Sequence, residues 1–96
     1  MFGMFRRQNL NFREEGNFLL ARVRTSKQGE VIMVRLSKTS EMSASGGGYF
    51  VRKVLVGPQT LDQAILEVTT NRAHKVTLAV VDGGELIPVR EWKDDS

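Results

Sequence analysis

The stretch NFLLARVRTSKQGEVIMVRLSK at residues 17–38 decides the expected fold, because it holds two apolar runs on either side of a short polar link. Gly29 in that link can adopt the positive φ that closes a tight hairpin. Opposing Thr25 to Glu30 then creates an entirely apolar row of cross-strand pairs: Val23 with Ile32, Ala21 with Val34, and Leu19 with Leu36. A slip of one residue would bury three arginines instead, so the pattern predicts this register.

The other face of the same hairpin mixes apolar and cationic side chains. It collects Leu20, Arg22, Arg24, Val31, Met33 and Arg35. We therefore expect a sheet with one apolar face toward the core and one face that is half apolar and strongly basic.

A third strand is predicted at residues 49–56, YFVRKVLV, which is rich in aromatic and β-branched residues and ends at Gly57-Pro58. Alternation places Tyr49 and Lys53 on one side of this strand and Phe50 and Arg52 on the other. Whichever side of the strand is buried, the opposite side keeps one cation and one aromatic ring.

The following segment, residues 58–71, is the one predicted helix. Thr60-Leu61-Asp62-Gln63 matches a capping box, and Leu61, Ala64, Ile65 and Val68 follow at the spacing of one helix face. Residues 75–92 then predict a second hairpin, which turns at Gly83-Gly84 and sets Val80 opposite Ile87. The element order β-β-β-α-β-β predicts a single small α+β domain, an antiparallel sheet of about five strands with one helix packed on one face.

Three further segments complete the predicted organisation. Residues 1–16 are expected to be an N-terminal arm that carries several phenylalanines, residues 17–92 form the domain, and residues 93–96 form an acidic tail. Residues 39–48 are small and glycine-rich, which predicts a flexible loop. Its Gly46-Gly47-Gly48 lacks the spacing and the following helix of a phosphate-binding loop.

Composition excludes several classes of chemistry. The 96 residues contain no cysteine, so disulfide scaffolds, thiolate metal sites and cysteine nucleophiles are excluded. His74 is the single histidine, and no metal-ligand or catalytic-triad spacing surrounds it, so we expect no metal, no cofactor and no enzyme activity. No apolar stretch is long enough to span a membrane, and we expect a cytoplasmic protein.

Charge is unevenly distributed along the chain. Residues 1–56 hold ten Lys or Arg against four Asp or Glu, whereas residues 57–96 hold four against seven. A basic first half is typical of proteins that bind a polyanion, and it also suits an acidic protein surface, including that of a second copy.

These observations predict a small binding protein. The expected site combines phosphate-pairing cations with rings on which unpaired bases can stack: Arg22, Arg24, Arg35, Arg52, Lys53, Tyr49 and Phe50. Nucleic acid, single-stranded rather than duplex, is the first expected partner. The alternative is a protein–protein interaction, as an inhibitor or adaptor or within a homodimer, through the same arginine-rich and partly apolar face.

Overall fold

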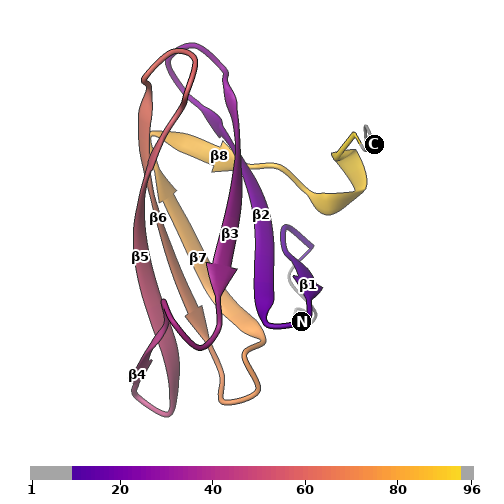
Figure 1. Ribbon diagram of the computed structural model, residues 1–96, viewed down its shortest axis with the longest axis vertical. Helices are drawn as coiled ribbons and strands as arrows, with labels where there is room; N and C mark the ends of the chain where they lie inside the picture. Colours follow the sequence, from indigo (N-terminus) through magenta and orange to yellow (C-terminus); the bar gives the residue numbers. More distant parts are fainter. Residues whose placement is uncertain (1–9, 94–96) are drawn as a thin grey trace, which may run out of the picture.

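The computed structural model describes residues 10–93, which form two antiparallel sheets packed face to face (Figure 1). The first sheet contains β1 (Arg13–Glu15), β2 (Phe18–Thr25), β3 (Val31–Ser37) and β8 (Gly84–Leu86). The second sheet contains β4 (Ser43–Ser45), β5 (Gly48–Val56), β6 (Gln63–Thr70) and β7 (Val76–Asp82). Within residues 10–93 the helical structure is limited to one short 3-10 turn, η2 (Val89–Glu91).

The first predicted hairpin is confirmed. β2 and β3 pair antiparallel with Leu19 opposite Leu36, Ala21 opposite Val34 and Val23 opposite Ile32. All six of these side chains are buried. The register therefore follows from the alternation of apolar residues, as expected for a sheet with one face in the core. The third predicted strand is also present, as β5.

The predicted helix at residues 58–71 is wrong, and with it the α+β fold class. This segment forms a turn followed by β6, which pairs with β5 on one side and β7 on the other. Its buried side chains alternate along the strand, at Ala64, Leu66, Val68 and Thr70. A short apolar run fits helical and strand spacing equally well, and here the β-branched residues and the two available neighbours favour the strand.

The residues of the predicted capping box have other partners. The Thr60 hydroxyl accepts from the amide of Asp62, two residues later, at 3.1 Å, and it donates to Glu30 Oε1 at 2.7 Å. Leu61 lies between them with a φ of 66°, which is incompatible with a right-handed helix. Thr60 thus closes a turn between β5 and β6 instead of starting a helix.

The second predicted hairpin is also wrong. β7 pairs with β6 in the second sheet, whereas β8 pairs with β2 in the first, with Val23 opposite Leu86. Gly83 and Gly84 permit this change of sheet. Gly83 has a φ of 87°, and a Cβ at Gly84 would lie 2.6 Å from the backbone oxygen of Arg24.

Side chains from both sheets form one core. Its fully buried members of largest volume are Leu36 and Val23 from the first sheet and Leu66 and Val68 from the second. Because each sheet contributes one apolar face to this core, the fold is an antiparallel β-sandwich.

The segment expected to be a flexible loop, residues 39–48, contains β4, which pairs with the start of β5. Gly46 and Gly47 form the turn between these strands with φ of 54° and 91°. At the N-terminal end, residues 13–15 of the expected arm form β1. Residues 1–9, with the phenylalanines at positions 2 and 5, and residues 94–96 of the expected acidic tail lie outside the described residues.

Candidate functional site

The outer face of the first sheet, which points away from the core, carries three of the arginines singled out by the sequence. Cross-strand pairing places Leu20 opposite Arg35, Arg22 opposite Met33, and Arg24 opposite Val31. We call these six residues, together with Arg13, Phe18 and Trp92, the arginine face. Met33 at its centre is 69% exposed. The face therefore has an apolar centre with arginine side chains around it.

A hollow of about 290 Å³ lies on this face. It is lined by residues of β1, β2 and β3 and by the indole that follows η2: Arg13, Leu20, Ala21, Arg22, Met33, Val34, Arg35 and Trp92. Apolar side chains form much of the lining, and three arginines surround them.

Trp92 is held in place by both its polar and its aromatic atoms. Its indole Nε1 donates to the backbone oxygen of Ile87 at 2.9 Å. The guanidinium carbons of Arg22 and Arg13 lie 4.7 Å and 5.2 Å from its ring centroid. Arg22 also donates to the backbone oxygen of Lys93 at 3.3 Å. The guanidinium–ring pairs are cation–π contacts. Together with the hydrogen bonds they hold the C-terminal segment against β2.

The arginines of this face differ in their electrostatic partners. Arg24 pairs with Glu85 of β8 at 3.4 Å, and Arg13 lies 3.9 Å from Glu15. Arg35 lies over the ring of Phe18, with its guanidinium carbon 3.9 Å from the centroid. Within residues 10–93, neither Arg22 nor Arg35 has a carboxylate partner. Both guanidinium groups instead lie over aromatic rings, that of Arg22 over Trp92 and that of Arg35 over Phe18.

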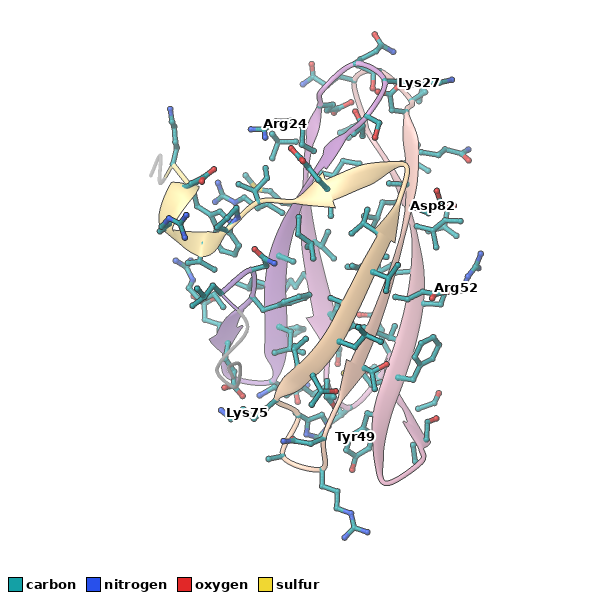
Figure 2. All side chains as sticks on the ribbon, turned by 180° about the vertical axis from the view of Figure 1, so that it is seen from behind. Arg24, Lys27, Tyr49, Arg52, Lys75 and Asp82 are labelled. Carbon is teal, nitrogen blue, oxygen red and sulfur yellow. The ribbon has the colours of Figure 1, made fainter. Side chains whose placement is uncertain are left out.

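The other four predicted site residues, all on β5, lie outside the arginine face. Arg52 belongs to the outer face of the second sheet, where it pairs with Glu67 of β6 at 3.4 Å. Figure 2 shows Arg24 and Arg52 on opposite sides of the molecule. Phe50 has the same strand parity as Arg52 and belongs to the same outer face. The predicted combination of Arg52 with Arg22 and Arg35 is therefore not brought together.

Lys53 and Tyr49 are on the inward-facing side of β5. Lys53 Nζ donates to Glu41 at 2.6 Å and to the backbone oxygen of Arg35 at 3.4 Å, so it links the two sheets at one edge of the sandwich. The Tyr49 ring stacks on His74, with 4.2 Å between centroids and 10° between planes. Both side chains are engaged within the protein.

Sequence reasoning missed Trp92, Phe18 and Arg13. Trp92 was assigned to the second hairpin, and its position depends on β8 joining β2, which no local pattern indicates. Phe18 could have been found, because it has the same parity along β2 as Leu20 and Arg22. Arg13 required the pairing of β1 with β2.

Buried and bridging carboxylates hold the strands that carry this face. Asp62, buried between the sheets, accepts from the hydroxyl of Thr25 at 2.7 Å and from the amide and side chain of Gln28 at 2.9 and 3.0 Å. The hydrogen bond from Thr25, followed by those from Gln28, lowers the pKa of Asp62. Asp62 thereby attaches the β2–β3 turn to the β5–β6 turn.

A second carboxylate acts at the other end of the sandwich. Glu14 on β1 accepts from Lys38, which follows β3, and from Lys75, which precedes β7, at 3.0 Å for the latter. The hydrogen bonds from Lys38 and then from Lys75 lower the pKa of Glu14 to about 2. Ionised Glu14 thus links β1 to the end of β3 in its own sheet and to the start of β7 in the second sheet.

The described part of the chain contains no cluster of three or more metal-ligating side chains. Between residues 10 and 93 there is also no helix long and apolar enough to cross a membrane. Comparison of the chain with protein-family models, with curated proteins and with solved structures finds no match.

Proposed function

We propose that the protein is a binding module whose arginine face takes an acidic and partly apolar segment of a partner protein. One observation carries this proposal: Arg22 and Arg35, which lack carboxylate partners within residues 10–93, flank a hollow lined by Leu20, Met33 and Trp92. Arginine, methionine and tryptophan are the residue types enriched in protein interfaces and their energetic centres. An acidic side chain would pair with the guanidinium groups while an apolar neighbour fills the hollow.

Single-stranded nucleic acid is the second candidate, supported by the same two arginines, which have no carboxylate partner in the described part of the chain, since guanidinium groups pair bidentately with phosphate. It ranks second because bases need ring faces on which to stack. Tyr49 stacks on His74, and Phe50 lies on the other sheet. The rings on the arginine face, Phe18 and Trp92, have guanidinium groups over them.

Selection of random peptides displayed on phage, with the immobilised protein as target, tests the first candidate. We expect enriched peptides to combine acidic and apolar residues, and their affinity to fall in the Arg22→Ala and Arg35→Ala variants. Arg52→Ala is the matched control, because it removes an arginine from the opposite face. Equal binding to all three variants, or no enrichment, would contradict the proposal.

Trp92 provides a direct readout, because it is the only tryptophan of the chain and it lines the hollow. A selected peptide should change its fluorescence emission saturably. Titration with oligothymidine in the same assay separates the two candidates. Binding of the oligonucleotide alone, weakening steeply as salt increases, would favour nucleic acid.

A further inference from the structure

The second sheet ends in a long strand that is paired on one side only. β7 forms its backbone ladder with β6, and no other strand among residues 10–93 pairs with it. A strand with one side unpaired presents a row of amide and carbonyl groups that can extend the sheet. The other edge of the second sheet is β4 over its three residues and β5 itself over Val51–Val56, where Arg52 and Lys53 place charges.

The first sheet has its own long edge strand, β3, and that edge is protected. Arg35 lies within β3, and Lys53 of β5 donates to its backbone oxygen at 3.4 Å. Charged side chains and coverage by a neighbouring element are the usual ways in which natural proteins prevent pairing at an edge. In β7 a bulge at Thr77 interrupts the ladder near the start of the strand, and Asp82 places a charge at its end, so the unprotected part is Leu78–Val81.

The sequence of β7, VTLAVVD, favours pairing. It contains no proline, its only charge is Asp82 at the end, and it is rich in β-branched residues. On its outward side Leu78 is 57% exposed and Val80 is 48% exposed. On β6 their cross-strand neighbours are polar, because Leu78 lies opposite Thr69 and Val80 lies opposite Glu67. Among the described residues, β7 thus has no partner strand along its outer backbone edge, and its Leu78 and Val80 side chains are largely exposed.

Charges at the two ends of the strand indicate what the partner is. Lys75 precedes β7 and Asp82 ends it, and Figure 2 shows them at opposite ends of the strand. Antiparallel pairing of β7 with β7 of a second copy would bring each Lys75 near the Asp82 of the other copy. Parallel pairing would bring like charges together. Lys75 shares the single negative charge of Glu14 with Lys38, so this end of the strand keeps a net positive charge. The ends of the strand are therefore complementary to an antiparallel second copy of themselves.

We infer that two copies of this chain associate through antiparallel pairing of their β7 strands. The register symmetric about Ala79 sets Leu78 opposite Val80 of the second copy. The two four-stranded sheets then form one continuous sheet across a two-fold axis. The apolar pairs Leu78–Val80 occur twice on its outer face and add side-chain contacts to the backbone ladder.

Matched lysine substitutions test this inference. Val80→Lys places a charge on β7, and Val54→Lys places the same charge at a similarly exposed valine, 54% exposed, on the same outer face but on β5, at the opposite side of the sheet from β7. Sedimentation velocity should show a dimer for the wild type and for Val54→Lys, and a monomer for Val80→Lys. Circular dichroism checks that each variant is folded.

Three results would overturn the inference: a wild-type monomer at the highest soluble concentration, a Val80→Lys dimer, or loss of the dimer in both variants. The last would show that the outer face associates by packing instead of by strand pairing. Hydrogen exchange on the wild type gives an independent measurement that needs no substitution. Amides of β7 on the side away from β6 should be protected in concentrated solution and lose protection on dilution, whereas unprotected amides in concentrated solution would contradict β7 pairing.

Discussion

The outer faces of the two sheets differ in what surrounds their exposed apolar side chains. Each sheet buries one side and leaves apolar side chains on the other. In the first sheet, arginines and the indole of Trp92 surround the exposed Met33, and guanidinium groups lie over aromatic rings. In the second sheet, Val54, Leu78 and Val80 are exposed around one cross-strand ion pair.

This difference indicates two kinds of interaction surface. Arginine stems cover apolar surface while their charged ends remain in water, so the first face is compatible with solvent and attractive to anions. The second face has few such side chains, and it adjoins an unpaired strand edge. In our two proposals, charge directs the first face toward a ligand of opposite sign, and the unpaired strand edge directs the second toward another strand.

Core substitutions test whether the two sheets unfold as one cooperative unit, and they have the largest expected effect. Leu36→Ala in the first sheet and Leu66→Ala in the second should each lower the free energy of unfolding by about 2–5 kcal/mol, because both leucines are fully buried. Urea denaturation followed by circular dichroism should show one transition for each variant. Two separate transitions would show that the sheets unfold independently.

Asp62, which connects the turns of the two sheets, should make stability depend on acid pH. Its folded-state pKa is lowered, so its contribution is present at neutral pH and is lost as the pH falls through that lowered pKa. Glu14, with a pKa of about 2 in place of 4.5, adds a loss between these two pH values. Asp62→Asn should reduce stability at neutral pH, and its stability should fall less between pH 7 and pH 2 than that of the wild type.

Thermal unfolding measured across this pH range checks the prediction. Glu91→Gln is the matched control, because Glu91 is an exposed carboxylate of η2, away from both turns. An acid dependence that is identical in Asp62→Asn and the wild type would rule out a role for the Asp62 carboxylate.

Aromatic truncations compare the two outer faces directly. Trp92→Ala removes the indole that contacts Arg22 and Ile87, and it should cost about 1–2 kcal/mol, somewhat less than full burial of a large side chain. Phe50→Ala removes a half-buried ring from the other face and should cost less. The urea midpoints, measured by circular dichroism, give the order. A larger loss of stability for Phe50→Ala than for Trp92→Ala would contradict this prediction.

The smallest expected effect is at the ion pair of the second face. Arg52→Ala removes the exposed pair with Glu67 and should change stability by about 0–1 kcal/mol, since such pairs contribute little in water. The difference from the wild type should shrink further at high salt. A loss well above this range in urea denaturation would show that the second face depends on charge as the first does.

Much of the first sheet could be predicted from sequence, because strict alternation over residues 17–38 leaves one register that buries no arginine. The same reasoning correctly placed Arg22, Arg24 and Arg35 together. It failed at residues 58–71, where Leu61, Ala64, Ile65 and Val68 satisfy helical spacing while Ala64, Leu66, Val68 and Thr70 satisfy strand spacing. Local periodicity does not separate these alternatives when the apolar run is short.

The grouping of the site residues depended on contacts that are distant in sequence. Tyr49, Phe50, Arg52 and Lys53 were assigned to the arginine face on the assumption that all strands share one sheet. In the structure β5 belongs to the second sheet, and the aromatic residue that completes the arginine face is Trp92.

The sequence by itself determined the hairpin of β2 and β3, the cationic character of its outer face, and the absence of cysteine chemistry. These properties depend on neighbouring residues and on composition, and therefore they can be deduced without knowledge of the fold. Only the tertiary structure decided that residues 63–70 form a strand, that β8 leaves β7 to join β2, and that β7 ends the second sheet unpaired. The physical reason is that a strand is stabilised by hydrogen bonds and packing with partners that are distant along the chain, so its identity depends on which partners the whole fold provides.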